Sequence, residues 1–433
     1  MSRLSRRTFL KGTAAAVGAV GLAGCVNVDV NVSKKKEIIM PKGGKRVVVL
    51  GAGWGGTTAA KYCKLTDPSI EVILIEKLDK FVSCPASNWV IGGFKALSDI
   101  TFSYNDLASN NGIKLLKTEA LGLEPANKII VTDAGKVEYD KLIVSPGVSF
   151  MYDQIEGWKD SAMDDFPHAY KAGPQTQLLR DKLVAMKNGE NVVLTVPPKP
   201  YRCPPGPYER ISLIANYLKN HKTGSKIIVL DPNDGIVSKG KLFMDGWNAY
   251  YSDVIEYITL APLKGIDRKN KVLQTEKGEF KAGVANIIPA MKAGDFAYKA
   301  GLVPEGERWA KVNAYNFESE VYKDVHVIGD STHAGSVGPV PKSGFVANSM
   351  GKACALAVVY ALNGQEQLPP SLANTCYSLI NEEEAIFVSA VYDYDPSVKR
   401  IMKTGGGLSP DRREIFGKHA RDWTLSIWSD MLT

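Results

Sequence analysis

Short apolar runs rich in β-branched residues alternate with longer amphipathic stretches along much of the chain, a pattern typical of buried parallel strands joined by helices. Val47–Leu50 and Val72–Ile75 predict two such strands, with a helix over Thr57–Leu65 between them. A second strand–helix–strand unit is predicted over residues 192–230. Between the two units, Ile113–Leu123 predicts part of a β-meander. The pattern therefore predicts an α/β fold with two parallel sheets.

The segment that joins the first predicted strand to its helix is rich in glycine. In Lys45–Gly56, the residues Gly51, Gly53 and Gly56 fit the spacing G-x-G-x-x-G. The first glycine permits a tight turn, the second lets the backbone approach a pyrophosphate, and the third allows close helix–strand packing. Glu76 ends the next strand about twenty residues later, where a carboxylate can bind a ribose hydroxyl. The pattern predicts a dinucleotide site; the alternative is a glycine-rich turn without a nucleotide.

Two later segments have the features of a flavin-binding domain. Tyr139–Gly147 predicts a strand and a turn, in which Gly147 lets the chain pass close to the pyrophosphate. Tyr322–Asp330 predicts a strand that ends in Gly329 and Asp330. The Asp330 carboxylate can bind the ribityl chain and the phosphate region. Together with the glycine motif, these segments predict an FAD-binding domain built from two distant parts of the chain.

A further helix is predicted to begin within Pro339–Lys352, next to the flavin. Its N-terminus, at Ser343 and Gly344, would point at the flavin N1 and C2=O atoms and stabilise the reduced anionic ring. Lys342 would add a full positive charge there, and the alternative is that Lys342 is a surface lysine.

The loop after the first strand of the second unit has prolines where a nucleotide-binding loop has glycines. Residues 197–209 read PPKPYRCPPGPYE. Because proline fixes φ and lacks an N–H donor, a phosphate cradle lined by backbone donors cannot form there in the usual way. We expect that this unit does not bind NAD(P)H and that it presents Cys203 instead.

Five of the six cysteines lie within the predicted folded part. Cys63 and Cys354 fall in predicted helices and are expected to be small buried side chains. Cys84, Cys203 and Cys376 fall in loops or at element ends that the fold brings toward the flavin, and any two could form a disulfide in an oxidising compartment. Cys84 could instead form a thioether with the flavin or be a small buried residue. No C-x-x-C-H motif occurs, so the chain is expected to bind no c-type haem itself.

The N-terminus has the pattern of an export signal. Residues 5–11 read SRRTFLK and precede an apolar run that is too short to span a membrane. This predicts a twin-arginine signal over residues 1–24, export of a folded protein that already holds its cofactor, and a periplasmic location. Leu22–Cys25 matches a lipobox, so Cys25 is expected to carry a lipid anchor; the alternative is cleavage nearby without lipidation.

The net charge of +7 is concentrated near the N-terminus. Without residues 1–24 and the basic stretch 25–46, the remaining chain carries about −1. This balance gives no indication of nucleic acid binding. The cluster Lys34–Lys36 suits an anionic membrane surface or a solvated tether.

Several motifs together resemble one known family, the flavoprotein subunit of flavocytochrome c sulfide dehydrogenase, a relative of the sulfide:quinone oxidoreductases. The most specific motif is RCPPGPYER at Arg202–Arg210. The supporting motifs are Ser83-Cys84 with Ser87-Asn88, PKSG at 341–344, Ala347-Asn348-Ser349 and Asn374-Thr375-Cys376-Tyr377-Ser378. The resemblance extends from about Lys45 to the C-terminus.

The resemblance implies a function and roles for particular residues. FAD would be bound covalently through Cys84, as an 8α-S-cysteinyl thioether. Cys203 and Cys376 would form a redox-active disulfide over the ring, and Glu209 would handle protons. Hydrosulfide would attack the disulfide, and the electrons would leave singly to a haem on a c-type cytochrome partner. Pro85 departs from the family pattern, in which an aromatic residue is expected after the linking cysteine.

The resemblance also implies an α/β fold with two dinucleotide-binding, glutathione-reductase-like domains and a C-terminal interface domain. The expected boundaries are a signal peptide with lipobox at 1–24, a linker at 25–45, FAD-binding parts at 46–160 and 291–362, a second nucleotide-binding-like domain without its NAD site at 161–290, and the interface domain at 363–433.

Two other functions fit parts of the pattern. A sulfide:quinone oxidoreductase would need an apolar or amphipathic C-terminal segment for the membrane, whereas Asp411–Arg421 is heavily charged and Leu425–Thr433 is short. A flavin-binding scaffold without turnover would have no use for three cysteines near the flavin. An NADH-linked disulfide reductase is disfavoured by the proline-rich loop.

Overall fold

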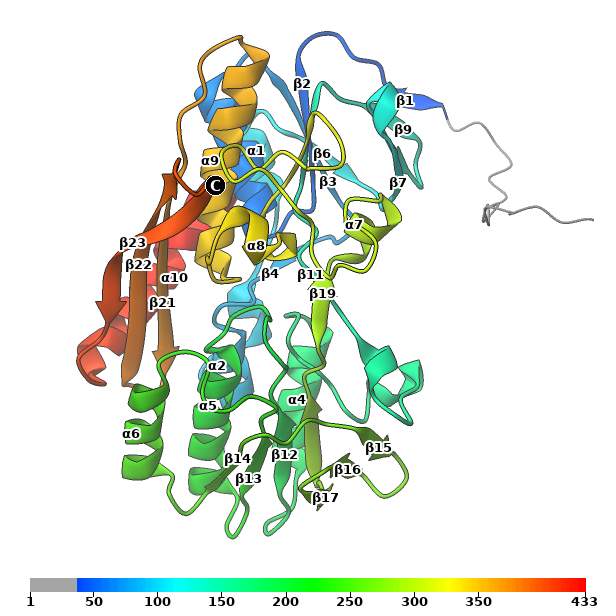
Figure 1. Ribbon diagram of the computed structural model, residues 1–433. Coiled ribbons are helices and arrows are strands. Elements are labelled where there is room, and N and C mark those ends of the chain that lie inside the picture. Colours follow the sequence, from blue (N-terminus) through cyan, green and yellow to red (C-terminus); the bar gives the residue numbers. More distant parts are fainter. Residues whose placement is uncertain (1–36) are drawn as a thin grey trace, which may run out of the picture. The chain divides into compact units, whose positions relative to one another are not determined.

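The computed structural model describes residues 37–433; the signal segment, Cys25 and residues 26–36 of the expected linker lie outside the described residues. A five-stranded parallel sheet forms the centre of the first domain (Figure 1). Its strands, in spatial order, are β20 (Val325–Val327), β10 (Lys141–Val144), β2 (Arg46–Leu50), β3 (Glu71–Glu76) and β6 (Lys114–Lys117). Because β20 comes from a much later segment than the other strands, two distant parts of the chain build this sheet.

Helices α1 (Trp54–Thr66) and α9 (Gly344–Leu362) pack together against this sheet. The two helices approach so closely that a Cβ on Gly351 would lie 2.6 Å from the Gly55 carbonyl oxygen, so only glycine fits at this position. Of the described helices, α9 alone is long and apolar enough to cross a membrane. However, 56% of its most apolar window is buried inside the fold, so α9 is a core helix of the first domain.

The prediction that Ile113–Leu123 belongs to one β-meander is wrong in part. The segment Ile113–Leu123 is divided between two sheets: β6 is the edge of the parallel sheet, and β7 (Ala120–Glu124) begins a meander. The meander continues through β8 (Ile129–Thr132) and β9 (Lys136–Glu138). Ile38–Met40, expected to be linker, forms β1 and pairs in parallel with β9.

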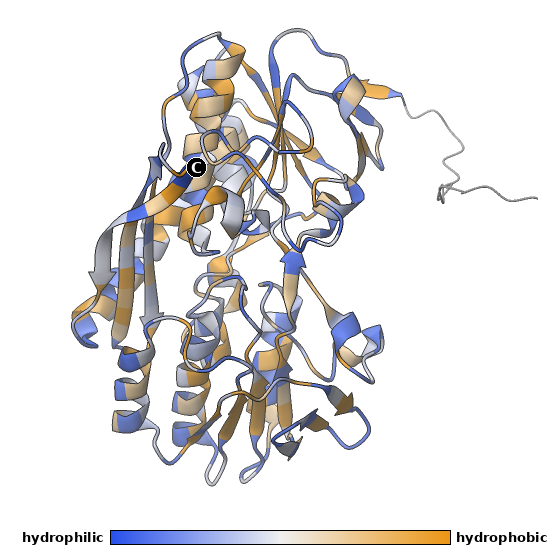
Figure 2. Cartoon of the chain, in the orientation of Figure 1, coloured by the Kyte–Doolittle hydropathy of each residue, from blue (hydrophilic) through white to orange (hydrophobic). Residues whose placement is uncertain are grey.

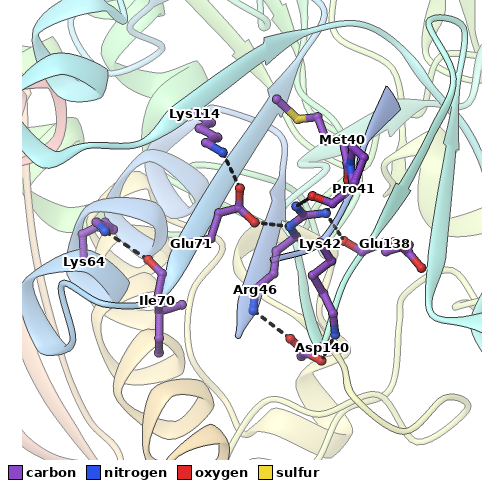
Figure 3. Close-up of polar contacts among 10 residues, drawn as sticks. All are labelled: Met40, Pro41, Lys42, Arg46, Lys64, Ile70, Glu71, Lys114, Glu138 and Asp140. Atoms are coloured by element: carbon purple, nitrogen blue, oxygen red, sulfur yellow. Dashed lines mark hydrogen bonds and ion pairs between the residues drawn. The ribbon is translucent and has the colours of Figure 1, made fainter. Parts of the chain in front are cut away.

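The start of β2 is fixed by Arg46, which is completely buried. Its guanidinium forms an ion pair with Glu71 of β3 and donates to the carbonyl oxygens of Met40 and Pro41 at 2.8 and 2.9 Å. Its backbone N–H donates to Asp140 Oδ2 at 2.7 Å (Figure 3). A buried cation needs such partners, and here they fasten residues 40–46 to the sheet whose other end carries the glycine motif.

The second domain contains a four-stranded parallel sheet and a small antiparallel sheet. The parallel strands, in spatial order, are β14 (Ile255–Ile258), β13 (Ile227–Leu230), β12 (Val192–Thr195) and β18 (Val284–Ile287). The helices are α4 (Pro174–Ala185), α5 (Gly206–His221) and α6 (Gly240–Tyr250), and the antiparallel strands are β15 (Gly265–Asp267), β16 (Val272–Thr275) and β17 (Gly278–Lys281). The central strands β2, β3, β12 and β13 are strongly hydrophobic, as buried strands require (Figure 2).

The C-terminal segment forms a three-stranded antiparallel sheet covered by one helix. Its elements are β21 (Ser371–Leu379), β22 (Ala385–Asp395), β23 (Arg400–Leu408) and α10 (Glu414–Leu432). Two tryptophans of α10 join this layer to the first domain. Trp423 stacks on Trp54 with ring centroids 5.9 Å apart, and Trp428 Nε1 donates to Ser83 Oγ at 3.0 Å.

The remaining elements are short connections. They are β4 (Phe81–Val82), α2 (Ser87–Gly92), β5 (Thr101–Phe102), α3 (Asn105–Asn111), β11 (Val148–Phe150), β19 (Met291–Ala293), α7 (Asp295–Lys299) and α8 (Ala334–Val337). The antiparallel pair β11 and β19 lies where the chain leaves and re-enters the first domain.

Candidate active site

Most of the predicted cofactor-binding residues line one cavity, which begins at the N-terminus of α1 and reaches the start of α5. The predicted residues on its wall are Gly53, Glu76, Cys84, Gly147, Cys203, Gly329, Asp330 and Gly344. Gly51 and Gly56 do not line it. They have a structural role instead, because a Cβ on Gly51 would lie 2.4 Å from the Ser145 carbonyl oxygen and one on Gly56 would lie 1.7 Å from that of Gly51.

The start of α1 leaves space for a phosphate group. No described atom lies within 4 Å of the place that a Cβ on Gly53 would take. Trp54 and Gly55, in the first turn of α1, also line the cavity. The N–H groups of a helix N-terminus favour an anion, so the glycine motif has the form that a pyrophosphate requires.

Glu76 ends β3 at the same cavity. Its Oε2 accepts the backbone N–H of Ala52 at 2.7 Å, and its Oε1 accepts those of Lys77 and Leu78 at 2.9 Å each. Because each carboxylate oxygen can accept two hydrogen bonds, Oε2 can still accept a hydroxyl donor. The position and orientation of Glu76 therefore suit a ribose.

Two charged side chains on the cavity wall have atoms without partners. Asp330 Oδ1 and Arg202 Nη2 are buried, and no described residue forms a hydrogen bond with either atom. Burial raises the pKa of Asp330, while the nearby Arg202 guanidinium acts in the opposite direction. Buried polar groups normally have partners. The hydroxyl and phosphate groups of FAD are partners of the right chemistry, so the wall fits this cofactor.

Lys342 and Ser343 do not line this cavity, and both have protein partners. Lys342 Nζ donates to the carbonyl oxygens of Asp330 and Thr332 at 2.8 and 2.7 Å, and it lies 3.7 Å from the centroid of the Trp309 ring. Burial lowers the pKa of Lys342 to about 7. Ser343 Oγ donates to Asn374 Oδ1 at 2.9 Å. Both residues therefore hold the chain around the cavity, and the cations on its wall are Lys80, Arg202 and Arg210 instead.

Cys84 lies on the cavity wall just before α2. Its Sγ accepts the backbone N–H of Ala172 at 3.4 Å, and its carbonyl oxygen accepts the Ser87 hydroxyl at 2.6 Å. These contacts hold the thiol at the surface of the cavity, where its sulfur can reach a bound ligand.

Cys203 and Cys376 meet at the other end of the cavity. Cys203 precedes α5 with a left-handed backbone at φ 55°, and its N–H donates to the Lys342 carbonyl oxygen at 2.6 Å. Cys376 lies in β21 of the C-terminal sheet. Both are free thiols whose side chains are in contact, and the Cys376 sulfur also lies 3.8 Å from the Tyr377 carbonyl oxygen.

The contact between the two thiols separates their acidities. The hydrogen bond with Cys376 holds the pKa of Cys203 well above its usual value, and burial raises it further. The same bond lowers the pKa of Cys376 to about 7; burial opposes this shift and the Lys239 ammonium assists it. Cys376 is therefore the more acidic member of the pair.

A second pocket borders the thiol pair. Cys203 lines both this pocket and the first cavity, whereas Cys376 lines the second pocket and not the first. The other walls of the second pocket include Val237, Pro341 and Val388. Small molecules can therefore approach the pair through a space separate from the cofactor cavity.

Glu209 is buried close to the thiol pair in the first turn of α5. Its Oε1 accepts the Trp89 indole N–H at 3.2 Å and the Leu379 backbone N–H at 2.9 Å. Its Oε2 accepts the Asn88 amide at 2.8 Å. Because all three partners are donors, they match a carboxylate that only accepts. Glu209 thus joins α2, α5 and β21 beside the two cysteines.

The second domain uses its acidic strand-end residue for internal contacts. Asp231 follows β13 and is completely buried. Its Oδ2 accepts the hydroxyls of Tyr208 and Tyr257 at 2.9 and 2.8 Å. Its Oδ1 accepts two N–H groups of Asn233 at 2.8 Å each. A dinucleotide site uses such a residue to bind the ribose, and here both oxygens already have protein donors.

Sequence reasoning assigned no role to three cations near the thiols. Arg202 could have been noticed because it precedes Cys203 in the chain. Arg210 is fully buried and lies beside the cavity; it donates to Asn88 Oδ1, Asn286 Oδ1 and the carbonyl oxygens of His168 and Ala169. Lys239 contacts Cys376 across 137 positions of sequence, and no local motif signals this contact.

Comparison with solved structures defines the fold of the protein. The sulfide:quinone oxidoreductase from Aquifex aeolicus matches with a TM-score of 0.71 and 18% identity, over 90% of this chain and 92% of that chain. A NAD-dependent persulfide reductase from A. fulgidus matches with a TM-score of 0.63 and 14% identity, over 89% and 77%. The family model for pyridine nucleotide-disulphide oxidoreductases matches residues 45–193. Together with the flavin-binding and sulfide dehydrogenase family models described next, these matches make the protein an FAD-dependent oxidoreductase with this two-domain fold.

More specific matches give the family. The model of the central part of the sulfide dehydrogenase (flavocytochrome c) flavoprotein chain matches residues 176–289, and the model of the flavocytochrome c sulphide dehydrogenase flavin-binding part matches residues 368–432. The chain belongs to the flavoprotein family of flavocytochrome c sulfide dehydrogenase, which is related to the sulfide:quinone oxidoreductases.

Curated relatives come from both groups. The flavoprotein chain of sulfide dehydrogenase (flavocytochrome c) from Chlorobaculum thiosulfatiphilum is 56% identical over 48 residues, which are 11% of this chain and the whole of that sequence. The sulfide-quinone reductase of Aquifex aeolicus is 23% identical over 79% of this chain and 83% of its own length. The mitochondrial sulfide:quinone oxidoreductase of Dictyostelium discoideum is 22% identical over 69% and 68%.

Proposed function

We propose that this protein oxidises sulfide through a redox-active Cys203–Cys376 disulfide and FAD, and passes the electrons to a c-type cytochrome partner. One observation carries the proposal: the two cysteines are in contact, and Cys203 also lines the cavity that fits FAD. Bound FAD would accept an electron pair from the cysteines and release it one electron at a time. Residues of this chain would bind the sulfide, form the persulfide and hold the cofactor.

The disulfide is the site that hydrosulfide attacks. Hydrosulfide forms a bond to one cysteine sulfur, the Cys203–Cys376 bond breaks, and its electron pair stays on the other cysteine as a thiolate. The attacked cysteine is then a persulfide. A second hydrosulfide removes the outer sulfur as a polysulfide, and re-forming the disulfide releases two electrons to the cofactor. The second pocket supports this sequence because it admits a small anion to the thiol pair without crossing the cofactor cavity.

Cys84 is the proposed attachment point for FAD. Its sulfur lies on the cavity wall, and Ala172 and Ser87 hold its position. A thioether from this residue would keep the cofactor in place after export. Cys63 and Cys354 are buried in α1 and α9 and do not line the cavity, so they do not compete for this role.

A cytochrome partner is favoured by the family name, since the Chlorobaculum relative is a flavocytochrome c subunit. A quinone acceptor is the second candidate because the relatives that align over most of the chain are sulfide:quinone oxidoreductases. Such an enzyme acts at a membrane, and α9, the described helix with the required length and hydropathy, is a core helix.

The second domain is proposed to have lost its nicotinamide nucleotide site. Asp231 is engaged by two tyrosines and an asparagine, and the proline-rich loop carries Cys203 to the flavin side. We also propose that the protein is periplasmic, exported by the twin-arginine route, and anchored by a lipid on Cys25. These last features rest on the N-terminal sequence.

The decisive experiment follows the flavin spectrum of the purified protein without oxygen. Sulfide should bleach the flavin, and oxidised cytochrome c should restore it while a quinone analogue does not. Restoration by the quinone analogue alone would favour the second candidate. A flavin that sulfide does not bleach would overturn the proposal, and bleaching by micromolar NADH would overturn the loss of the nucleotide site.

Variants of the cysteines link this spectrum to the thiol pair. Cys203→Ala and Cys376→Ala should each retain flavin and lose bleaching by sulfide. Cys354→Ala is the control, because Cys354 is a free thiol buried in α9, outside the cavity wall. Turnover of either active-site variant at the rate of the control would exclude the disulfide route.

A further inference from the structure

Lys239 is a buried lysine that the proposed reaction has not yet used. The residue is only 4% exposed and has a left-handed backbone at φ 59°, immediately before α6. Its Nζ donates to the Cys376 carbonyl oxygen at 3.0 Å and to Ser378 Oγ at 2.8 Å. Within residues 37–433, these two hydrogen-bond partners are neutral and no ion pair with a carboxylate accompanies them.

A buried ammonium group without a counter-charge is costly. Burial accordingly lowers the pKa of Lys239, and the negative charges that counter this effect are, in order, those of Cys376, Glu209 and Cys203. Glu209 already accepts three hydrogen bonds from other donors. The Cys376 sulfur is therefore the anion best placed to balance Lys239.

Two groups near Cys376 favour a negative charge on its sulfur in the reduced pair. The Cys203 thiol contacts the Cys376 sulfur. Lys239 Nζ bonds Ser378 Oγ, and the side chain of Ser378 lies on the same face of β21 as that of Cys376 because the two residues are two positions apart. Glu209 is the remaining charged group that acts on this sulfur, and it acts in the opposite direction. Two favourable groups thus face one unfavourable group.

We propose that Lys239 is a positioning residue that holds Cys376 as the thiolate of the reduced pair, while Cys203 holds the proton. Reduction of the disulfide by two electrons with uptake of one proton gives one thiol and one thiolate, so charge and atoms balance. The role of Lys239 in turnover rests on the proposed function. There, a stabilised Cys376 thiolate is the better leaving group in any step that breaks a sulfur–sulfur bond at Cys376. The thiolate itself exists independently of sulfide.

The test measures the acidity of Cys376 in the flavin-loaded full chain. The protein is reduced with dithiothreitol, excess reductant is removed without oxygen, and iodoacetamide alkylation of the Cys376 peptide is followed by mass spectrometry from pH 5 to 10, because the thiolate is the reacting form. The variants are Lys239→Met, Lys239→Gln and the charge-preserving Lys239→Arg. Lys241→Met is the matched control, since Lys241 lies two residues further along, in the first turn of α6, with a side chain that is 85% exposed.

In the wild type the alkylation rate should reach half its maximum near pH 7, in line with the pKa of about 7 for Cys376. Lys239→Met and Lys239→Gln should lower the rate at pH 7 about tenfold by moving the midpoint upward, whereas Lys239→Arg and Lys241→Met stay within about twofold. A wild-type midpoint above pH 9 would overturn the proposal even if the neutral variants do not fold. So would folded, flavin-loaded neutral variants with the wild-type midpoint.

This assay contains no sulfide, so its result is separate from that of the sulfide experiment. A shifted Cys376 midpoint in a protein whose flavin sulfide does not bleach would support the role of Lys239 and reject sulfide oxidation. Bleaching by sulfide with an unshifted midpoint would do the reverse.

Discussion

The Glu209 carboxylate accepts the backbone N–H of Leu379 at 2.9 Å, and this bond ties the helix after Cys203 to the strand that carries Cys376. Asn88 and Trp89 donate to the same carboxylate from α2. The two cysteines come from different domains, so this link helps to hold them in contact, as do the bonds of Lys239 and Ser343 to β21. The structural role of Glu209 can be tested by mutation.

Glu209→Ala should lower the free energy of unfolding by about 1–3 kcal/mol, because three buried donors lose their acceptor. It should also slow re-formation of the Cys203–Cys376 disulfide. Urea unfolding of the flavin-loaded protein checks the first effect, and thiol counting after reduction checks the second. Glu366→Ala is the control, since Glu366 is exposed. Equal stability of the two variants would show that Glu209 does not act as a clamp.

Gly53 and Gly56 should respond differently to the same substitution. Gly56→Ala should prevent correct folding, because the new Cβ would lie 1.7 Å from the Gly51 carbonyl oxygen. Gly53→Ala should fold but lose flavin, because its Cβ would project into the open space that suits the pyrophosphate. Circular dichroism and the ratio of flavin to protein absorbance distinguish the two effects. Gly43→Ala, in open space before β2, should change neither; full flavin content in Gly53→Ala would contradict the cofactor placement.

Cys84→Ser should convert a covalent flavin into a removable one. After precipitation with trichloroacetic acid, we expect flavin absorbance in the wild-type pellet and in the supernatant of the variant. Cys63→Ala should behave like the wild type, because Cys63 is buried in α1 and does not line the cavity. Wild-type flavin in the supernatant would rule out the thioether.

His168 should make the protein sensitive to acid. Burial, aided by the nearby Arg210, lowers the pKa of His168 to about 3 from an ordinary value of 6.5, and its Nδ1 accepts the N–H of Tyr170 at 2.8 Å. The unfolded chain therefore binds a proton more readily. The contribution of His168 to stability is complete above pH 6.5 and is lost as the pH falls toward 3.

The test for His168 compares urea unfolding at pH 7 and pH 4.5. His168→Asn keeps an acceptor for the Tyr170 N–H but does not titrate, so between these pH values it should lose about 2–3 kcal/mol less stability than the wild type. His221→Asn is the control, because His221 is exposed at the end of α5. Parallel losses in all three proteins would mean that His168 is not buried in its neutral form.

The elements around the glycine motif could be predicted from sequence because their signals are local. The strand before Gly51 and the helix after it lie within a few residues of the motif. The segment Ile113–Leu123 was harder, since nothing in its apolar pattern marks the point where the chain passes from one sheet to another. Lys342 illustrates a different limit. The sequence places a lysine at the start of α9, but its partners, Asp330, Thr332 and Trp309, depend on how the chain folds around it.

The contacts of Cys376 with Cys203 and Lys239 could not be predicted from local sequence patterns. Loop position indicated three cysteines of interest but left their pairing open. The pairing depends on the C-terminal sheet, which places β21 beside the start of α5. Lys239 follows a loop without any motif. Its contact with Cys376 depends on the left-handed backbone at Lys239, which sequence alone does not predict.

The position of β20 in the first sheet has a consequence for biosynthesis. β20 pairs with β10, whose sequence is synthesised long before it, and Asp330 follows directly after β20. A nascent chain that has emerged from the ribosome only as far as residue 320 therefore lacks one edge strand and part of the cofactor wall. FAD can be captured only late in translation or after chain release, and any truncated product ending before β20 would be left as an empty apoprotein for the cell's proteases to remove.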